Sequence, residues 1–384
     1  MSSLPHIVHL ITHLGRGGAA RNALLSCLGL ARRGFRVSLL SGPSESPERE
    51  LIEQARSAGV ALQTLPHLQR EIHPLADLAA AREIREALSR ARPDLLHTHQ
   101  SKAGLLGRWI GKKLFQLPVV HTPHGHVFEG YFSDWRTACF VELERQAARW
   151  CDLLIGLTRR EVEDHLALGV GFRARWRVIH SGIDPAVIRD RGKAGADVRR
   201  SMGFPGDAIV LASVGRLEPV KGIVDFLPHF RRALLREPRL RWVIIGDGAA
   251  RPKIEEAIRG LDLVGKVALG GWLENPHGLI AGCNALLHPA RNEGMGRAIV
   301  EAFALGLPVF AASSGSIPEL LSDPARGLLF DWRRRETLPE RLLEFVERLP
   351  ELASGREVRM AAAEDYSVEG MVEKLALVYR DILG

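Results

Sequence analysis

The stretch RNEGMGRAIVEAFALGLPV places two carboxylates around a glycine-rich turn that opens an expected helix. Glu293 precedes the turn, and Glu301 lies one turn into a helix expected from about residue 297 to residue 305. Backbone amides at a helix start, with glycines that allow close approach, can bind a diphosphate. Flanking carboxylates can accept hydrogen bonds from sugar and ribose hydroxyls; the alternative is a capping acid and a solvated helix glutamate. The candidate ligand-binding residues here are Glu293, Gly294, Met295, Gly296 and Glu301.

Two cations stand five positions apart in the stretch SVGRLEPVKG, in the loop that follows an expected strand. Arg216 and Lys221 could stabilise the negative charge that a diphosphate gains as it leaves a sugar. An arginine and a lysine at this spacing are also common on protein surfaces. The pair therefore supports a diphosphate-binding site only in combination with the acidic stretch.

A second glycine-rich loop, HLGRGGAARN, follows the first expected strand and opens the first expected helix. Gly17 and Gly18 would let the backbone approach a phosphate or a sugar. Gly15, Gly17 and Ala20 also fit the dinucleotide fingerprint, which requires an acid at the end of the second strand to bind the ribose. That strand, RVSLLSG, ends in serine and glycine instead, which weakens the prediction of a nicotinamide cofactor.

Five histidines end one expected strand and follow the next, in two adjacent loops. They could suggest a metal, but no carboxylate or cysteine joins them at ligand spacing, so no metal site is expected. We interpret them as a polar lining with one imidazole that reaches a sugar. They are His97, His99, His121, His124 and His126.

The segment GLLGRWIGKKLF mixes large apolar side chains with Arg108, Lys112 and Lys113. It could lie on a membrane surface, or it could be a core helix with a basic solvent face. Aromatic residues after the histidine loop could either pack in the core or bind an acceptor. They are Phe128, Tyr131, Phe132 and Trp135.

Composition narrows the class of protein. The 384 residues are 46% apolar and 25% charged, which is ordinary for a globular chain, and the length favours two domains with a cleft between them. No apolar run approaches the roughly eighteen residues of a membrane span, and no basic region precedes an apolar stretch at the start. Four scattered cysteines lack CxxC spacing, so we expect a reducing compartment, the cytoplasm, and neither secretion nor a membrane span.

The net charge of +7 is concentrated in the first half of the chain. Residues 1–190 hold 25 Lys and Arg against 19 Asp and Glu, a balance of +6, and the rest hold 27 against 26, a balance of +1. This excess could favour anionic lipid, nucleic acid or a phosphorylated substrate, or it could be a solvated arginine-rich surface. Nucleic acid is not expected as a partner because the arginines are dispersed and no binding motif is present.

Short apolar runs alternate with helical patterns along the chain, which is typical of parallel βαβ units. A first series runs from HIVHLIT to WRVIHSGID and a second from AIVLASVG to LPVFAA. The predicted fold class is α/β, with two doubly wound domains whose ligands bind at the carboxyl ends of the strands. We predict an N-terminal domain over residues 1–185, a C-terminal domain over residues 186–364 and a terminal helix over residues 365–384. That helix is amphipathic by the spacing of Val368, Met371, Val372, Leu375 and Val378.

These motifs together resemble the retaining glycosyltransferases of family 4, which have the GT-B fold of two Rossmann-like domains. The resemblance covers essentially the whole chain, through GRGGAAR, HTHQSKAGLLGR, PVVHTPHG, HSGID, GRLEPVKG, IGDG, the acid pair, IPELL and the terminal helix. It implies that the N-terminal domain binds the acceptor, that the C-terminal domain binds a nucleotide sugar, and that the last helix packs back on the N-terminal domain.

The resemblance also implies roles for single residues. Arg216 and Lys221 match the pair that holds the donor diphosphate, Glu301 matches the acid that binds the ribose, and Glu293 matches the acid near the donor sugar. The expected catalytic residues are His124, Glu293, Arg216 and Lys221. The expected donor-binding residues are Gly17, Gly18, Arg216, Lys221, Gly246, Glu293, Gly294, Met295, Gly296 and Glu301. The expected acceptor-side residues are His99, Lys102, His126 and Tyr131.

Local departures from the family pattern concern the donor. His288 and Ala290 stand where a serine often precedes the acid motif, and Pro219 lies within the phosphate loop. None of these differences removes a charged group, so the expected activity stands. They leave open which sugar nucleotide is the donor.

The sequence therefore predicts a retaining, metal-independent hexosyltransferase in cell-surface polysaccharide or lipopolysaccharide assembly. It would move a sugar from a nucleotide diphosphate sugar, a UDP-sugar by preference, to a hydroxyl of a glycan or lipid-linked acceptor. No cofactor is expected because Arg216, Lys221 and the helix start offset the diphosphate charge. The sequence leaves open whether the protein also makes peripheral contact with the inner face of the cytoplasmic membrane. The alternatives are a sugar-nucleotide epimerase of the same fold and a non-catalytic sugar-nucleotide-binding protein.

Overall fold

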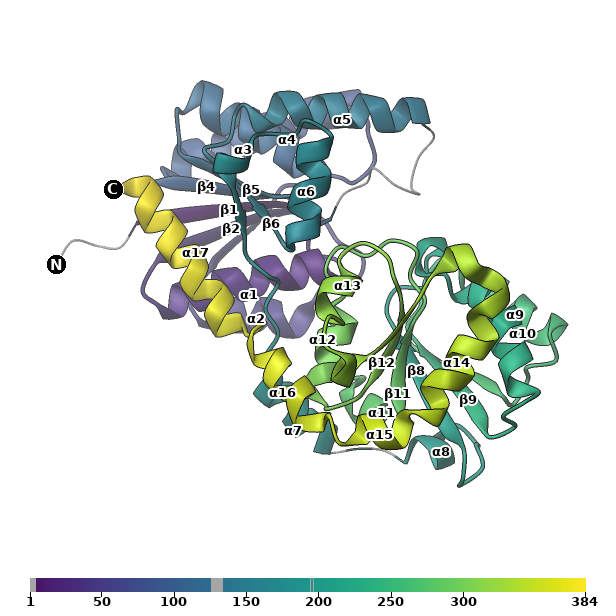
Figure 1. Cartoon of the computed structure of the whole chain (residues 1–384). Coiled ribbons are helices and arrows are strands. Elements are labelled where there is room, and N and C mark those ends of the chain that lie inside the picture. The colour runs from purple at the N-terminus through teal and green to yellow at the C-terminus, as the bar shows by residue number, and fades with distance from the viewer. Residues whose placement is uncertain (1–4, 126–133, 194, 196) are drawn as a thin grey trace. The chain divides into compact units, whose positions relative to one another are not determined.

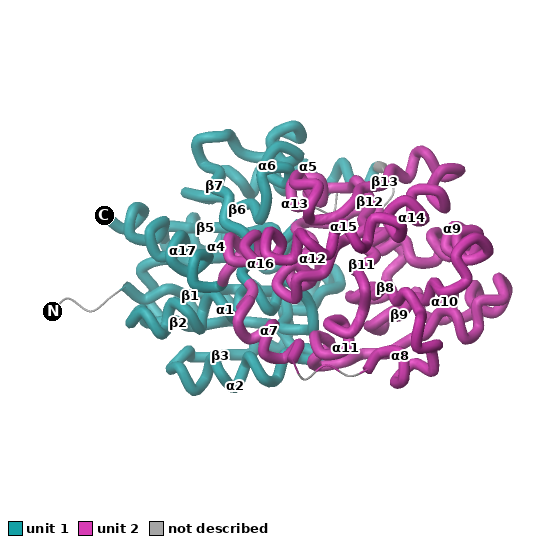
Figure 2. The backbone as a smooth tube through the Cα atoms, turned by 60° about the horizontal axis from the view of Figure 1, so that its bottom comes forward, with its two compact units in different colours: residues 1–182, 368–384 teal, residues 183–367 magenta. Residues whose placement is uncertain are grey.

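The structure is a computed structural model that describes residues 5–125, 134–193, 195 and 197–384. The chain divides into two compact units, here called unit 1 (residues 1–182 and 368–384) and unit 2 (residues 183–367), shown in Figure 2. The predicted boundaries were after residues 185 and 364. In each unit, helices cover a parallel sheet (Figure 1), so the predicted α/β class with two Rossmann-like domains is confirmed.

Unit 1 contains a parallel sheet whose strand order is β3-β2-β1-β4-β5-β6-β7. The order reverses between β1 and β4, and in such sheets ligands bind at the carboxyl ends of the strands beside this reversal. The loops after β1 and β4 therefore occupy the favoured position in this unit. The strands are β1 His6–His13, β2 Arg36–Gly42, β3 Ala61–Thr64, β4 Leu95–His99, β5 Val119–Thr122, β6 Leu153–Gly156 and β7 Trp176–Val178.

The helices of unit 1 connect these strands in the usual crossover manner. They are α1 Gly18–Arg32, α2 Arg49–Ser57, α3 Pro74–Ala91, α4 Ser101–Leu114, α5 Asp134–Ala148, α6 Arg159–Ala167 and α17 Val368–Leu383, with a short 3-10 turn at Arg173–Arg175. The basic segment of the sequence forms α4, and Arg108 in it is fully buried. It donates to Glu144 at 2.8 Å and to the Gly104 carbonyl at 2.8 Å. The expectation of a solvent-facing basic residue is therefore wrong for Arg108.

The terminal helix α17 packs back on unit 1 beside α1 (Figure 1), as predicted. Met371, Val372 and Leu375 are buried in the same core cluster as residues of α1. Gly29 in α1 makes the close approach possible, because a Cβ there would lie 2.4 Å from Val372 Cγ2. The amphipathic spacing read from the sequence thus matches the face that the helix buries.

Unit 2 repeats the architecture with the strand order β10-β9-β8-β11-β12-β13. Its order reverses between β8 and β11, so the loops after these two strands meet at one edge of the sheet. The strands are β8 Ile209–Val214, β9 Leu240–Ile245, β10 Val267–Gly271, β11 Ala285–His288, β12 Val309–Ala312 and β13 Gly327–Phe330. The helices are α7 Pro185–Lys193, α8 Val198–Ser201, α9 Ile223–Leu234, α10 Arg251–Gly260, α11 His277–Ala281, α12 Arg297–Ala304, α13 Ile317–Leu320, α14 Leu338–Glu347, α15 Leu349–Ala353 and α16 Arg356–Glu364. Short 3-10 turns span Pro219–Lys221, Pro324–Arg326 and Trp332–Thr337.

Aromatic side chains fill the core of unit 2. Phe226 packs edge-on against Trp242 with ring centroids 6.0 Å apart, and Phe310 stacks on Phe345 at 5.2 Å. Such pairs add to the energy of burial. The Trp242 indole donates to the Ser213 hydroxyl at 2.9 Å, so its buried N–H is satisfied. These contacts stabilise the sheet that carries the loops after β8 and β11.

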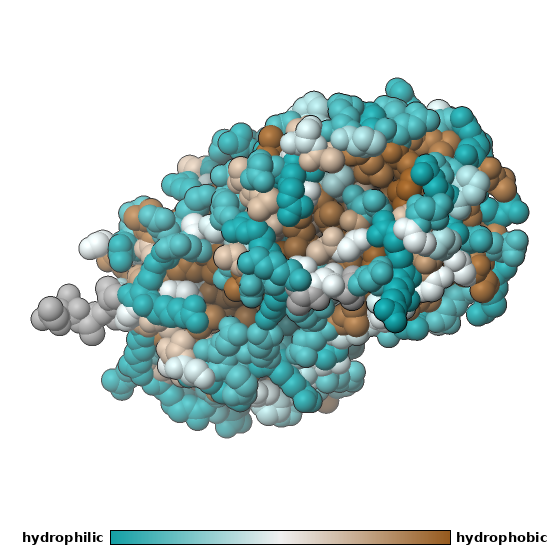
Figure 3. All heavy atoms as spheres, turned by 90° about the horizontal axis from the view of Figure 1, so that it is seen from below, coloured by the Kyte–Doolittle hydropathy of each residue, from teal (hydrophilic) through white to brown (hydrophobic). Residues whose placement is uncertain are grey.

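Large apolar side chains also reach the surface. Figure 3 shows one face of the molecule, on which apolar areas interrupt a mainly hydrophilic surface. In unit 1, the start of α3 and the turn before it expose three aliphatic side chains by more than 70% of their area, and α4 exposes a further pair. They are Ile72, Leu75 and Leu78, then Trp109 and Leu114. Among the described residues, none of the helices is both long and apolar enough to cross a membrane.

Candidate functional site

A pocket in unit 2 lies at the carboxyl ends of β8 and β11, where the fold predicts a ligand site. It contains both cations that the sequence analysis selected, Arg216 and Lys221, together with His288 at the end of β11. Its lining residues are Ser213, Val214, Gly215, Arg216, Leu217, Lys221, Ile223, Ile245, Leu287, His288, Pro289 and Ala290.

Backbone contacts fix the loops around this pocket. Gly246 has a φ of 140°, and a Cβ there would lie 1.9 Å from the Gly215 carbonyl oxygen. Gly222 has a φ of 66°, and a Cβ there would lie 2.2 Å from the Pro289 carbonyl oxygen. Both positions need glycine for space and for the left-handed backbone. The expected donor-binding residue Gly246 is thus a point where the loops after β8 and β9 touch.

Glu293 is the centre of a charged cluster. Its Oε2 lies 2.6 Å from Lys221 Nζ and 3.0 Å from His288 Nε2. Burial would raise the pKa of the Glu293 carboxyl, but Lys221 and His288 outweigh it and hold that pKa well below its ordinary value. The carboxylate is therefore ionised and positions the ammonium group of Lys221 at the pocket.

Arg216 is placed differently from Lys221. Its guanidinium lies 3.3 Å from Glu218 Oε1, and its side chain is 42% exposed. An exposed pair of this kind contributes little to stability. The Glu218 pair therefore restrains Arg216 less than Glu293 restrains Lys221.

The second acid, Glu301, lies in α12 with two basic side chains near its carboxylate. Arg297 Nη2 is 3.5 Å from Oε1, and His277 Nε2 is 3.5 Å from Oε2. A carboxylate can accept several hydrogen bonds, so a further donor such as a ribose hydroxyl could join these contacts. The structure thus brings Glu293 and Glu301 to the two sides of one helix start, as the sequence analysis expected.

The turn between the two acids has the conformation that an anion site needs. Gly296 caps α12 with a φ of 76°, and Met295 beside it is buried, so it can offer a ligand only its backbone. The Gly294 carbonyl is occupied by the Ser316 hydroxyl. The Ile299 amide donates to the Gly296 carbonyl at 2.9 Å, and the positive end of the α12 dipole favours an anion at this helix start.

In unit 1, the predicted glycine loop opens α1 at Gly18. The amide of Gly17 donates to Glu48 Oε1 at 3.3 Å. A carboxylate oxygen thus stands where the sequence analysis expected a phosphate oxygen. A phosphate that binds this amide has to displace Glu48.

The histidines of unit 1 form a connected group on β1, β4 and β5. His99 Nδ1 lies 2.8 Å from His124 Nε2, and His9 Nδ1 lies 2.9 Å from His99 Nε2. His121 belongs to β5 rather than to the loop after it, and its Nδ1 lies 2.9 Å from the Thr98 hydroxyl. His9 was not selected from the sequence, although its place on the first strand, in register with His97, puts it beside the other rings.

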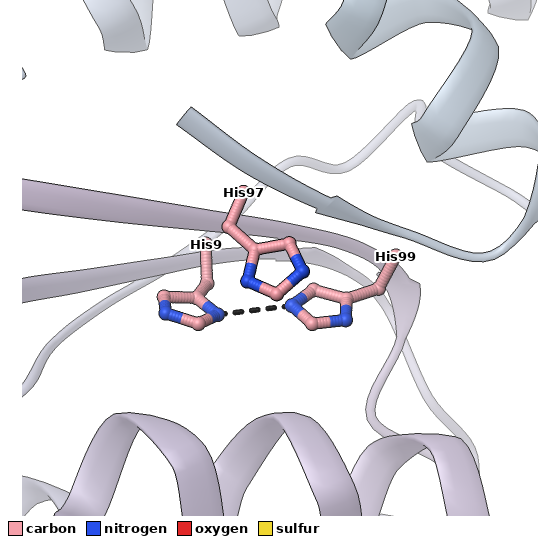
Figure 4. A group of neighbouring side chains, drawn as sticks. All are labelled: His9, His97 and His99. Carbon is pink, nitrogen blue, oxygen red and sulfur yellow. Dashed lines mark hydrogen bonds between the residues drawn. The ribbon is translucent and has the colours of Figure 1, made fainter. Parts of the chain in front are cut away.

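Three of these rings, those of His9, His97 and His99, lie close enough to suggest a metal site (Figure 4). However, His97 already uses both nitrogens, one with the Tyr379 hydroxyl at 2.5 Å and the other with the Thr122 hydroxyl at 2.8 Å. Its ring lies against that of His99, with centroids 4.2 Å apart. A bound metal would have to displace these hydrogen bonds, so the geometry favours a hydrogen-bonded core.

The structure describes two of the four expected acceptor-side residues, His99 and Lys102. His99 is fully buried with both nitrogens bonded to other histidines, so it lies behind His124 and cannot touch an acceptor directly. Lys102 pairs with Asp77 at 2.6 Å and donates to the Glu71 carbonyl. His126 and Tyr131 lie outside the described residues.

Glu161, which the sequence motifs do not single out, is a further buried acid next to the histidine group. It is 3% exposed, and its two carboxylate oxygens accept from the amides of Gly125 at 2.6 Å and Leu157 at 2.5 Å. The first bond holds the turn directly after His124. The signal in the sequence was the TRRE pattern, in which Thr158 and Glu161 form a capping arrangement at the start of α6.

The environment of the Glu161 carboxyl predicts that the stability of the protein depends on pH. Burial raises the pKa of Glu161 to about 7, although the two amides oppose the shift. An acid whose pKa is raised by folding binds more protons when folded, so its contribution to stability falls as pH rises between the two values. We expect the free energy of unfolding of the wild type, relative to Glu161→Gln, to fall by about 3 kcal/mol between pH 4.5 and about 7.

Urea unfolding of both proteins across this pH range measures the effect. Glu163→Gln, an exposed acid on the same helix, is the matched control and should show no such trend. A pH-independent difference between wild type and Glu161→Gln would contradict the prediction.

Comparisons with known proteins agree with this arrangement. The family described as "Glycosyl transferase 4-like domain" matches residues 17–182, and "Glycosyl transferases group 1" matches residues 196–355. The chain is 28% identical to the D-inositol 3-phosphate glycosyltransferase of Actinosynnema mirum, over 94% of this chain and 92% of that protein. It is 27% identical to the enzyme of the same name from Mycobacterium tuberculosis, over 96% and 79%.

Solved structures show the same fold. HepE of Anabaena in complex with UDP is similar with a TM-score of 0.80 and 20% identity, covering 98% of this chain and 100% of that chain. WaaG, a glycosyltransferase involved in lipopolysaccharide biosynthesis, is similar with a TM-score of 0.76 and 19% identity, covering 97% and 99%. The matched domains, the two parallel sheets and the returning helix α17 agree on one assignment: the chain belongs to glycosyltransferase family 4 and has the GT-B fold.

Proposed function

We propose that this glycosyltransferase transfers a sugar from a nucleotide diphosphate sugar to an acceptor hydroxyl with retention of configuration. The observation that carries the proposal is the pocket of unit 2, in which Arg216 and Lys221 stand at the carboxyl ends of the strands beside the acid Glu293. The cations can bind the diphosphate of a sugar nucleotide, and carboxylates can accept hydrogen bonds from its hydroxyl groups.

The charges suggest how the pocket would act. Lys221, held by Glu293, and the more exposed Arg216 would stabilise the negative charge that develops on the leaving diphosphate. The acceptor hydroxyl would attack from the face that the diphosphate leaves, and a phosphate oxygen would take its proton. Two side-chain cations and the start of α12 would supply the positive charge, so we propose that no divalent metal is required.

The donor can be identified by thermal shift against UDP-, GDP-, ADP- and TDP-sugars, with and without EDTA. We expect one nucleotide sugar to raise the melting temperature through binding to the folded state, with a UDP-sugar favoured because HepE of Anabaena was solved with UDP and with UDP-glucose. The shift should survive EDTA and should be lost in Glu301→Ala, which removes the proposed ribose ligand.

Glu256→Ala, an exposed acid on α10, is the control and should respond like the wild type. A shift abolished by EDTA would overturn the metal-free proposal. Conversion of the donor without an acceptor would favour an epimerase, and binding without any turnover would favour a non-catalytic protein.

The acceptor has two candidates. Our first is a hydroxyl of a glycan or lipid-linked saccharide, supported by the resemblance in fold to WaaG. The second is an inositol phosphate, supported by the similarity to D-inositol 3-phosphate glycosyltransferases. Turnover with the identified donor and each acceptor class, analysed by mass spectrometry, decides between them.

A lipid-linked acceptor would require unit 1 to approach a membrane. Ile72, Leu75 and Leu78 are exposed by 73, 75 and 72%, and α4 adds exposed Trp109 near the basic residue Lys113. Exposed apolar side chains beside basic residues are typical of surfaces that bind anionic lipid. We propose peripheral contact through this region, on the cytoplasmic side of the membrane.

Sedimentation with liposomes of phosphatidylglycerol tests the contact. We expect binding at low salt that weakens as salt screens the charges, and weaker binding by the double variant Leu75→Ser, Leu78→Ser. Liposomes of phosphatidylcholine alone are the control. No sedimentation with anionic liposomes at low salt would contradict the proposal.

A further inference from the structure

The hydrogen-bonded histidines of unit 1 form a chain with a defined direction. His9 lies on β1 and His99 at the end of β4, and Figure 4 shows the hydrogen bond between their rings. His99 continues the chain to His124, whose Nε2 lies 2.8 Å from His99 Nδ1. Three imidazoles are thus joined end to end, from the interior of the sheet to the carboxyl end of β5.

All three rings are neutral at ordinary pH. Burial lowers the pKa of His9 to about 3 and of His124 to about 3, and burial together with the other histidines lowers the pKa of His99 well below its usual value. A neutral imidazole carries one N–H and one acceptor nitrogen. His99 must therefore donate to one neighbour and accept from the other, which leaves only two arrangements of protons along the chain.

The two arrangements differ at the ends. If His99 donates to His124, then His9 Nε2 is a bare acceptor and His124 carries its N–H on Nδ1. If His99 donates to His9, then His9 carries an N–H on Nε2 and His124 Nδ1 is bare. Both end nitrogens are buried, and among the described residues neither has a hydrogen-bond partner.

The two proton arrangements place the unpartnered N–H on different rings, and this difference decides between the arrangements. His9 is fully buried in the core of unit 1, where no described group can accept from Nε2. Buried N–H groups without a partner are rarer and more costly than acceptors without one. His124 lies at the carboxyl end of the sheet, where ligands of this fold bind, and the residue is half-buried. Its Nδ1 is itself covered, so a ligand oxygen that completes its bonding has to displace the groups that cover it.

We infer that His9 and His99 are positioning residues that fix the tautomer of His124, so that His124 carries its proton on Nδ1 and acts as a hydrogen-bond donor. The backbone supports this fixed presentation, because His124 has a φ of 64° and Glu161 holds the next amide. With respect to the transfer, the inference rests on the function proposed above. His124 then donates to an oxygen of the substrate that binds unit 1 and does not take the acceptor's proton.

The tautomer can be observed without any assay of activity. Long-range proton–nitrogen correlation spectra of protein labelled with nitrogen-15 histidine distinguish a protonated from a bare ring nitrogen. At pH 7 we expect His124 with protonated Nδ1 and bare Nε2, and no protonation of the ring down to pH 5.5. A protonated Nε2, or an imidazolium in this range, overturns the inference even if the glycosyltransferase proposal holds.

Two variants test the chain itself. His9→Phe removes the donor to His99 and should give a mixture of His124 tautomers. Thr122→Val removes a hydrogen bond to the neighbouring ring of His97 without touching the chain, and should leave the His124 spectrum unchanged. An unchanged spectrum in His9→Phe shows that His9 does not set the tautomer and contradicts its assigned role.

Turnover then links the tautomer to the reaction. An asparagine amide lies near the position of Nδ1, and asparagine tolerates the left-handed backbone of residue 124, whereas a glutamine amide reaches toward the position of Nε2. His124→Asn should keep at least tenfold more turnover than His124→Gln. Equal turnover in the two variants would contradict the donor role. Absence of activity in the wild type would instead count against the proposed function, and the spectra would still decide the tautomer.

Discussion

Lys221→Ala is expected to lower turnover by about two to three orders of magnitude, the usual cost of removing one group that stabilises charge in a transition state. The Michaelis constant for the donor should change much less, because the leaving diphosphate carries more negative charge in the transition state than in the ground state. Steady-state kinetics with the identified donor measure both quantities. Lys253→Ala, an exposed lysine on α10, is the matched control and should match the wild type.

The same substitution should also lower stability, because among the described residues it leaves His288 as the basic partner of the Glu293 carboxylate. Removing one member of a largely buried ion pair leaves an uncompensated charge, and we expect a loss of about 1–3 kcal/mol. The double variant Lys221→Ala, Glu293→Gln should regain the melting temperature but not the turnover. Wild-type turnover in Lys221→Ala, or recovery of turnover in the double variant, would refute the role of Lys221.

Gly246→Ala is expected to disrupt the pocket of unit 2 through the backbone alone. The added Cβ would lie 1.9 Å from the Gly215 carbonyl oxygen, and a φ of 140° is unfavourable for alanine. The loops after β8 and β9 must then separate, which moves the residue after Gly215, Arg216. We expect a loss of stability of more than about 3 kcal/mol, seen as a lower melting temperature, and no stabilisation by the nucleotide sugar.

Gly260→Ala is a control of the same chemistry. Gly260 ends α10, and a Cβ there would meet no atom within 4 Å. Alanine is the better helix former by up to about 1 kcal/mol, so this variant should be as stable as the wild type or more so. A Gly246→Ala protein that melts like Gly260→Ala and still binds the donor would show that the contact with Gly215 does not hold the pocket together.

Much of the site in unit 2 could be predicted because its residues are local in the sequence. Glu293, the glycine turn and Glu301 lie within one strand-to-helix connection, so their spacing already determines that the acids flank the helix start. Strand patterns also show that Arg216 and Lys221 follow β8. The meeting of the two segments follows from the strand order, which places β8 next to β11.

Other residues could not be found in this way, because their contacts join segments far apart in the chain. Glu161 holds Gly125 across 36 positions, and His9 reaches His99 across 90. A buried arginine such as Arg108 looks solvated in a basic stretch until its partner Glu144 is known. His99, expected on the acceptor side, proves to lie behind His124 for the same reason.

The sequence by itself determined the family, the two α/β domains and the acids and cations that lie together in unit 2, because periodic burial and short motifs record contacts between near neighbours. Only the tertiary structure decided which partner each charged or polar side chain takes: Lys221 with Glu293, Glu48 with the Gly17 amide, and His9 with His99. The physical reason is that ionisation and tautomer depend on burial and on groups a few ångströms away. Strand pairing brings these groups together from any distance along the chain.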